Sequence, residues 1–495
     1  MHHWTHGAAT ETAVEPAVEP GAWSPGAITA DRRRWWLLAL LGAAQFMLII
    51  DVTVVNVALP SIGKSLVLDR SQLTWIVTAY TLFFGSLLVL GGRLADAFGR
   101  RRMFLTGLGL FVAASLGSGL APDGNVLVIT RSLQGIAASM LSPAALSMVT
   151  TTFQGPERNR ALAVWAALAG TGAAVGVVLG GVLTSGPGWQ WIFFINVPVG
   201  VLVALGVTRL VAAGGPRRAR MELDLPGGVT FALAIASLLW AVIDAGDNGW
   251  TSATTLVRLG AAVAFLVVFA WRERATSVPL VRLEMLADRR FSGAVGLMLT
   301  ASVVLGAMVF LDTLYLQLAV GLSAIETGLL FLPMALALIV GSQWGVLYIG
   351  HHGQRGSAVT GFVAAGLGML YLSRLPTSGD VLIDVLPGLI VTAFGIGAIF
   401  VSATTTAFSR VSDEEAGRAS GFVNTSHEVG LSLGAALAST IGGASLAGGA
   451  GAGGGGFNAA FLACVVVAAI GVVVARGVMP TTAPAVTAGR RMFAH

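Results

Sequence analysis

The chain has 495 residues, of which 55% are apolar and only 11% are charged, and its mean hydropathy is +0.82. A water-soluble domain cannot bury so large an apolar fraction, so the composition excludes an ordinary soluble protein and indicates one that resides in a lipid bilayer. The formal net charge is +5, and because the cations fall in short loops, they do not indicate a surface that binds nucleic acid.

Residues 1–34 are predicted to be a disordered cytoplasmic tail. This segment is polar, contains the tandem repeat Ala13 to Pro16 and Ala17 to Pro20, and shows no apolar periodicity. The first apolar block follows Arg34 and is too long for the core of a signal peptide, so we expect it to be a retained span.

Apolar blocks of similar length then repeat along the chain. A transmembrane helix needs roughly 20 apolar residues, and on this criterion the sequence predicts an all-α membrane protein with about fourteen spans. The predicted spans lie near 35–59, 73–94, 103–121, 126–150, 161–183, 191–211, 225–244, 256–271, 291–316, 325–349, 357–373, 382–409, 419–446 and 457–476.

Arginines concentrate in the loops that follow even-numbered spans, which places these loops in the cytoplasm by the positive-inside rule. We therefore expect a multi-pass protein of the inner (plasma) membrane with both termini in the cytoplasm. The connection 272–290 mixes leucines with arginines and favours an interfacial helix. Asp244 and Asp247 lie beside an opposite, outer loop and are expected to be solvated.

The first span contains a carboxylate and an amide, Asp51 and Asn56, in the run Asp51 to Pro60. An ionisable group inside a span is costly and marks a functional site by default. We interpret Asp51 as a proton-binding group and Asn56 as a substrate contact. The alternative is that Asp51 is a structural acid, hydrogen-bonded to neighbouring helices.

A glycine-bounded turn with one acid among several arginines connects the second and third spans. Its glycines allow two helices to approach closely, and its charges can form a cytoplasmic latch. The alternative is a loop that only carries the positive-inside signal. The residues expected to act in gating are Gly92, Asp96, Gly99, Arg100 and Arg101.

The fourth span places Arg131 about four residues inside an apolar helix, followed by Gln134 and Gly135. A bare guanidinium there costs about 2.5–3.5 kcal/mol on insertion scales, so it needs a partner or a water-filled cavity. We expect it to take part in proton coupling with Asp51. The alternative is that the side chain snorkels to the outer interface.

The fifth span carries glycines at four-residue spacing, Gly172, Gly176 and Gly180. This spacing builds a smooth ridge against which another helix can pack and slide. The sixth span opens with the aromatic run Trp189 to Phe194, which is typical of the membrane interface.

The second half of the chain has further polar groups within predicted spans. Asp312 and Glu428 are candidates for proton coupling, and Gln317, Asn424 and His427 are candidates for substrate binding. The alternatives are that Asp312 lies near the outer surface and that His427 and Glu428 pair with each other.

Several kinds of chemistry lack the residues that they require. The segment nearest to a phosphate-binding loop, Ala58 to Ser65, lacks its first glycine, and neither a His-Glu-x-x-His helix nor a Gly-x-Ser-x-Gly turn occurs. The single cysteine, Cys464, allows no disulfide framework. We therefore expect no enzyme activity, no metal site and no cofactor.

Taken together, the motifs of span 1, of the loop after span 2, and of spans 4 and 6 resemble those of the major facilitator superfamily. Within it the chain is most similar to the fourteen-helix drug:proton antiporters, over residues 34–476. It departs from the superfamily's signature loop at Ala97, where a basic residue is usual, and from the fourteen-helix exporters at His427 and Glu428, where Arg-Gln is common. Its fifth span, with Val177 after Gly176, also lacks the usual proline.

The resemblance implies a six-helix bundle at 35–211, two inserted helices with cytoplasmic linkers at 212–290, a second bundle at 291–476 and a cytoplasmic tail at 477–495. It further implies proton-driven export of a hydrophobic or cationic, drug-like small molecule by alternating access. The expected partners are this substrate, protons and the bilayer, with no nucleic acid, and we expect a monomer. The missing proline leaves a proton-coupled importer or metabolite permease on the same fold as the alternative.

Overall fold

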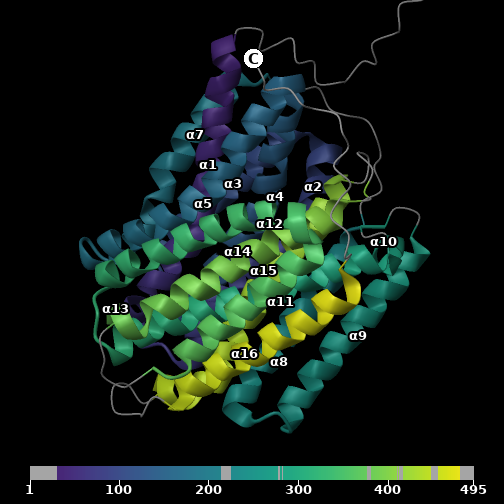
Figure 1. Ribbon diagram of the computed structural model, residues 1–495. Helices are drawn as coiled ribbons and strands as arrows, with labels where there is room; N and C mark the ends of the chain where they lie inside the picture. Colours follow the sequence, from purple (N-terminus) through teal and green to yellow (C-terminus); the bar gives the residue numbers. More distant parts are fainter. Residues whose placement is uncertain are drawn as a thin grey trace, which may run out of the picture.

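Every regular element is a helix in the part of the chain that the computed structural model describes (Figure 1). This part comprises residues 31–212, 224–276, 279–280, 283–375, 381–409, 411, 416–447 and 455–479. Most of both predicted tails lies outside it. Helix α1 begins at Asp31, so the last four residues of the predicted N-terminal tail are helical.

The helices follow the predicted apolar blocks in chain order. Their bounds are α1 Asp31–Leu66, α2 Arg70–Phe98, α3 Arg100–Gly119, α4 Gly124–Thr152, α5 Gly155–Ser185, α6 Trp191–Phe194, α7 Asn196–Leu210, α8 Leu225–Asn248, α9 Ala253–Ala275, α10 Leu283–Ala287, α11 Arg289–Leu314, the π-helix η2 Tyr315–Ala319, α12 Ala324–Leu372, α13 Val381–Asp384, α14 Leu386–Phe408, α15 Ala416–Ala447 and α16 Gly455–Val478.

Eleven helices within the described residues are long and apolar enough to cross a bilayer. One of them, α12, has 49 residues and breaks at Gly353, whose φ of 71° is not helical, so it covers the two predicted spans 325–349 and 357–373. The predicted spans 161–183 and 419–446 fall within α5 and α15. The all-helical membrane fold is confirmed, whereas the count of fourteen spans stays a prediction.

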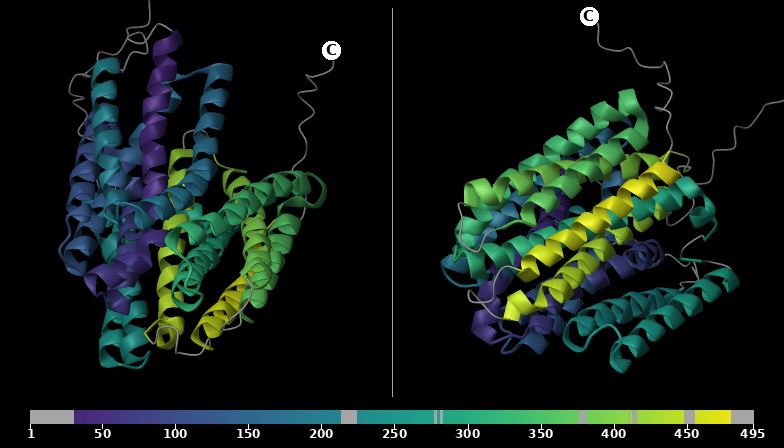
Figure 2. Two further views of the ribbon diagram at one scale, coloured as in Figure 1. Left: turned by 90° about the vertical axis from the view of Figure 1, so that its left-hand side faces the viewer. Right: turned by 60° about the horizontal axis from the view of Figure 1, so that its bottom comes forward.

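The helices form two groups, α1 to α7 and α11 to α16, and the second is inclined against the first (Figure 2, left). Each group has an apolar core of its own. A third core joins the two groups along the C-terminal half of α1. It places Val54 of α1 and Val177 of α5 in the same cluster as Leu311 of α11 and Phe331 of α12. The two groups therefore share buried apolar surface at this end of the molecule.

The glycine ridge of α5 lies against α1. A Cβ atom on Gly172 would come within 3.0 Å of the Ile49 side chain, and one on Gly180 within 3.0 Å of the Val54 Cα. A Cβ on Gly176 would collide with the Thr53 hydroxyl. The absence of these Cβ atoms is what lets the two helices approach so closely.

Helices α8 and α9 pack against each other (Figure 2, right), and α8 contacts both α2 and α15. Leu239 and Val242 of α8 share an apolar cluster with Leu82 of α2 and Val429 of α15. The inserted pair therefore contacts both groups of helices at their boundary.

The turn between α8 and α9 is held by Asp244, and the expectation that this residue is solvated is wrong. Asp244 is only 8% exposed. Its carboxylate accepts hydrogen bonds from the hydroxyls of Thr254 and Thr255, each at 2.9 Å, and from Asn248 at 3.0 Å, and it pairs with Arg258. Asp244 is buried because the hairpin itself supplies partners for the charge.

Arg70, at the start of α2, connects three elements. Its guanidinium pairs with Asp247 of α8 at 2.6 Å and donates to the Ile243 carbonyl at 2.9 Å. It also donates to the Ser439 hydroxyl of α15 at 3.1 Å, and Ser439 lies 2.6 Å from the Thr74 hydroxyl. Asp247, which we expected to be solvated, is half exposed but paired.

A cysteine cross-link tests the contact between α2 and α15. In a Cys464→Ala background, Thr74→Cys with Ser439→Cys should oxidise readily to a disulfide, because these two side chains face each other. The matched control pairs Thr74→Cys with Thr440→Cys, since Thr440 instead donates to the Val242 carbonyl of α8. Cross-linking is read from gel mobility after mild oxidation, and equal rates for the two pairs would contradict the placement of the seam.

Candidate functional site

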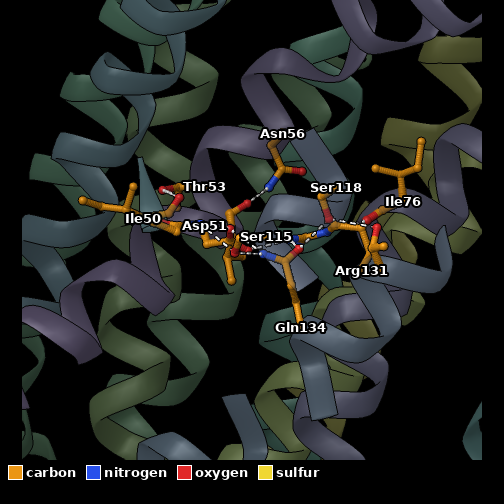
Figure 3. Close-up of polar contacts among 12 residues, drawn as sticks. Ile50, Asp51, Thr53, Asn56, Ile76, Ser115, Ser118, Arg131 and Gln134 are labelled. Atoms are coloured by element: carbon orange, nitrogen blue, oxygen red, sulfur yellow. Dashed lines mark hydrogen bonds and ion pairs between the residues drawn. The ribbon is translucent and has the colours of Figure 1, made fainter. Parts of the chain in front are cut away.

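The structure brings Asp51 of α1 and Arg131 of α4 together in the interior of the first group of helices (Figure 3). Arg131 NH1 lies 2.5 Å from Asp51 Oδ2, and the two residues are 1% and 0% exposed. The alternative that Arg131 snorkels to the interface is therefore wrong. Because removing one partner of a buried pair leaves an uncompensated charge, such a pair is strongly held once formed.

The second carboxylate oxygen of Asp51 is held by two amides. Oδ1 accepts from Gln134 Nε2 at 3.1 Å and from Asn196 Nδ2 at 2.8 Å. Both amides also donate to the Ser115 hydroxyl, at 2.8 and 3.3 Å. The carboxylate is thus bonded by groups from α4 and α7, and Ser115 of α3 accepts from both amides.

Arg131 makes further contacts besides the ion pair. Its Nε donates to the Ile76 carbonyl at 3.2 Å and its NH1 to Gln134 Oε1 at 3.0 Å. The guanidinium carbon lies 4.5 Å from the ring centre of Tyr80 and 5.9 Å from that of Phe193. These contacts offset the cost of holding the cation away from water.

Sequence reasoning assigned no role to Gln134, Asn196, Ser115 or Tyr80. The first two stand within motifs that carry the family resemblance, so a signal was present for them. Ser115 and Tyr80 stand in apolar helices with no motif, and only the packing of α2 and α3 against α4 shows that they contact the pair.

Asn56 is not brought to the pair. It is half-buried, and its amide donates to the Val52 carbonyl of its own helix at 3.0 Å (Figure 3). Gln317, another candidate for substrate binding, lies in η2 and donates to the Val57 carbonyl of α1 at 2.8 Å. Gln317 therefore links the second group of helices to α1.

Asp312 lies in α11 and is 0% exposed, so the alternative that it sits near the outer surface is wrong. Neither of its carboxylate oxygens has a hydrogen-bond partner in the part of the chain that the structure describes. Burying a carboxylate without partners is costly, which makes Asp312 a candidate for binding a proton or a cationic substrate.

Three candidates on α15, Asn424, His427 and Glu428, turn to different neighbours. The His427 Nδ1 atom lies 2.8 Å from the Ser302 hydroxyl of α11. Buried Glu428 Oε2 has no partner among the described residues, and no contact joins it to His427, which is bonded to Ser302 instead. The alternative that His427 and Glu428 pair with each other is therefore wrong. Asn424 is exposed and donates to the hydroxyl of Ser420, on the same helix.

The turn between α2 and α3 contains the expected gating residues. Gly99 joins the helices with a φ of 97°, and a Cβ on Gly92 would touch Pro143 at 3.7 Å. Asp96 is half exposed and lies 3.9 Å from Arg100, within the same turn. Arg101 donates to the carbonyl of Thr208 in α7 at 3.5 Å, a contact at the limit of hydrogen bonding.

A model of the Major Facilitator Superfamily matches residues 41–435. The puromycin resistance protein pur8 of Streptomyces alboniger is 40% identical over 415 residues, which are 83% of this chain and 82% of that protein. The lincomycin resistance protein of Streptomyces lincolnensis is 38% identical over 83% of this chain and 85% of that protein. The cephamycin export protein CmcT of Amycolatopsis lactamdurans is 34% identical over 90% and 92%.

A solved structure of similar fold is the bacterial homolog of the human lysosomal transporter Spinster in its inward-facing and unoccupied conformation. It aligns with a TM-score of 0.63 over 91% of this chain and 98% of that chain, at 15% identity. At this identity the similarity shows the fold alone. The sequence matches bear out the superfamily resemblance that the motifs indicated. This chain, a multi-pass membrane transporter, belongs to the major facilitator superfamily.

Proposed function

We propose that this transporter exports a hydrophobic or cationic, antibiotic-like small molecule, driven by protons that enter in exchange. The fully buried Asp51–Arg131 pair carries the proposal, because an ion pair inside a span is retained where a transport pathway uses it. The proposed direction of transport, export, is supported by the relatives, which are antibiotic resistance and export proteins. A transporter of this kind catalyses no chemical reaction.

Proton binding to Asp51 changes what Arg131 can do. With Asp51 ionised, the guanidinium is held by the carboxylate at 2.5 Å. With Asp51 protonated, the charge is gone and Arg131 keeps only neutral acceptors such as the Ile76 carbonyl and Gln134 Oε1. The two protonation states thus favour different packing of α1 and α4, and each proton contributes about 2.3 kcal/mol per 100 mV of membrane potential.

Asp312 and Glu428 serve as further proton or substrate-cation sites, because each has a buried carboxylate oxygen to which no described residue donates. Gln317, His427, Asn424 and Asn56 serve as substrate contacts. The protein acts as a monomer in the plasma (inner) membrane with both termini in the cytoplasm, and uses no cofactor.

Alternating access follows from movement of residues 35–211 against residues 291–476, as two bundles. The glycine ridge of α5 allows α1 to slide without steric hindrance, and the turn of Asp96 and Arg100 gates the cytoplasmic side. Movement must open the contact between Thr74 and Ser439 at the opposite end of α2, so a cross-link there should stop transport.

The decisive experiment measures proton release from acid-loaded inside-out vesicles across a panel of lipophilic cations and antibiotics. The parent protein should raise the internal pH when substrate is added, and Asp51→Asn should abolish this because Asn cannot bind the proton. Asp69→Asn, which neutralises an exposed acid that caps α2, is the matched control and should behave as the parent, because Asn caps a helix about as well as Asp. The mechanism is overturned if the parent never releases protons or if the Asp51→Asn variant still releases them. Substrate uptake into vesicles of the opposite orientation would instead favour an importer.

Neutralising Asp51 and neutralising Asp312 should have different effects on the free energy of unfolding. Asp51→Asn should lower the free energy of unfolding by about 3–5 kcal/mol, because Arg131 is left as an uncompensated buried charge. Asp312→Asn should leave it unchanged or raise it by about 1–3 kcal/mol, because an unpaired carboxyl is replaced by a neutral group of similar shape. Thermal unfolding of the purified variants in detergent measures both, and an equal loss in the two would contradict the assigned environments.

A further inference from the structure

A groove lies between α1 and α5, on the side of the glycine ridge where both helices begin. Along the ridge, from Gly172 to Gly180, the two backbones touch closely. Nearer the start of the helices they leave a cavity of about 410 Å³ between them. Beyond the groove, Arg34 of α1 pairs with Glu157 of α5 at 2.8 Å, so the two helices are joined at both ends of it.

Every described residue that lines the groove is apolar. Trp35, Gly42 and Phe46 line it from α1, and Val164 and Leu168 line it from α5. A helix rises about 1.5 Å per residue, so the stretch from Trp35 to Phe46 is roughly 16 Å long. This is about half of the hydrocarbon core of a bilayer, which is about 30 Å thick. The groove therefore has the length of one leaflet.

The groove lies on the flank of the first group of helices. Its described lining comes from α1 and α5 alone, and no residue of α11 to α16 contributes to it. Trp35 is 37% exposed, its neighbour Trp36 64% and Val164 45%. Apolar side chains exposed along a span face acyl chains rather than water. The groove therefore opens to the bilayer.

Positive charge stands at the end of the groove where the two helices begin. Arg32 precedes Trp35 by three residues, and Arg160 precedes Val164 by four, so each arginine lies on the same helix face as the lining residue that follows it. Both arginines are exposed, whereas Glu157, the acid of this part of α5, is already paired with Arg34. An anionic group at this end would therefore meet two guanidinium groups.

We infer that this groove binds an anionic phospholipid of the cytoplasmic leaflet. One acyl chain fills the apolar groove between α1 and α5, and the phosphate binds Arg32 and Arg160. The same arginines repel a cationic substrate, which separates this site from the transport pathway. The lipid supplies the packing between α1 and α5 that direct contact supplies along the glycine ridge. This inference uses the proposed orientation in the membrane and does not depend on proton coupling.

Lipid binding to the purified full chain in detergent tests the inference. Phosphatidylglycerol and phosphatidylcholine with the same acyl chains are titrated in, and binding is read by native mass spectrometry and by the rise in unfolding temperature. The parent should prefer phosphatidylglycerol by about thirtyfold, which corresponds to about 1 kcal/mol for each arginine. Inorganic phosphate alone should have no effect, because it lacks the acyl chain. Equal affinity for the two lipids overturns the inference.

Neutral variants of the two arginines test the headgroup end. Arg32→Gln combined with Arg160→Gln should abolish the preference for phosphatidylglycerol and leave the affinity for phosphatidylcholine unchanged. The matched control, Arg289→Gln combined with Arg476→Gln, removes two exposed arginines from α11 and α16 and should keep the preference. An equal loss of preference in both double variants would indicate a general effect of surface charge and overturn the site.

A variant that fills the groove tests the acyl-chain end. Gly42→Leu should lower the affinity for both lipids about tenfold or more, because a Cβ there already lies 2.9 Å from Leu168 Cδ1. Gly109→Leu in α3, where a Cβ meets no atom within 4 Å, is the matched control and should bind as the parent does.

Unchanged lipid affinity in a folded Gly42→Leu protein would contradict the placement of the acyl chain. The arginine variants decide the test alone if Gly42→Leu does not fold. A groove that binds tetraphenylphosphonium, a lipophilic cation, in place of phosphatidylglycerol overturns the lipid assignment. Each of these measurements reads binding without transport, so their failure leaves the proposed function standing.

Discussion

A guanidinium buried among apolar helices needs a carboxylate beside it, and the ion pair of Arg131 with Asp51 is the interaction on which the first group of helices depends. Charge burial costs several kcal/mol per ion unless the remaining donors and acceptors are also filled. Gln134, Asn196 and Ser115 fill them from three helices. The pair therefore sets how α1, α3, α4 and α7 must be placed relative to one another.

The second group of helices handles its acids differently. Asp312 and Glu428 each bury a carboxylate oxygen that no donor of the described residues reaches, whereas both oxygens of Asp51 are occupied. A satisfied carboxylate gives a stable arrangement, and an unsatisfied one is readily neutralised by a proton or by a cationic ligand. We propose that these acids serve different steps of transport. The two groups of helices that carry them meet where α2 contacts α15.

Close approach of backbones is the second requirement of the fold, because helices that move against each other in a membrane need smooth faces. The α5 ridge provides this against α1, and Gly85 does so where Glu428 meets α2. Helix α8 covers the same α2–α15 seam from outside, with Arg70 bonded to α8 and to Ser439 of α15. Its position ties the inserted pair to the boundary that changes in the mechanism we propose.

The sequence alone determined the membrane class, the order of the helices and the superfamily, because span length, arginine placement and short motifs are local properties of the chain. It also singled out Asp51 and Arg131, since charges stand out in apolar blocks. The tertiary structure decided which groups meet: Tyr80 and Ser115 have no local signal, and Asp244 is buried only because Thr254, Thr255 and Arg258 fold back onto it. Partners far apart in the chain become neighbours only through packing, and burial depends on those partners rather than on the residue itself.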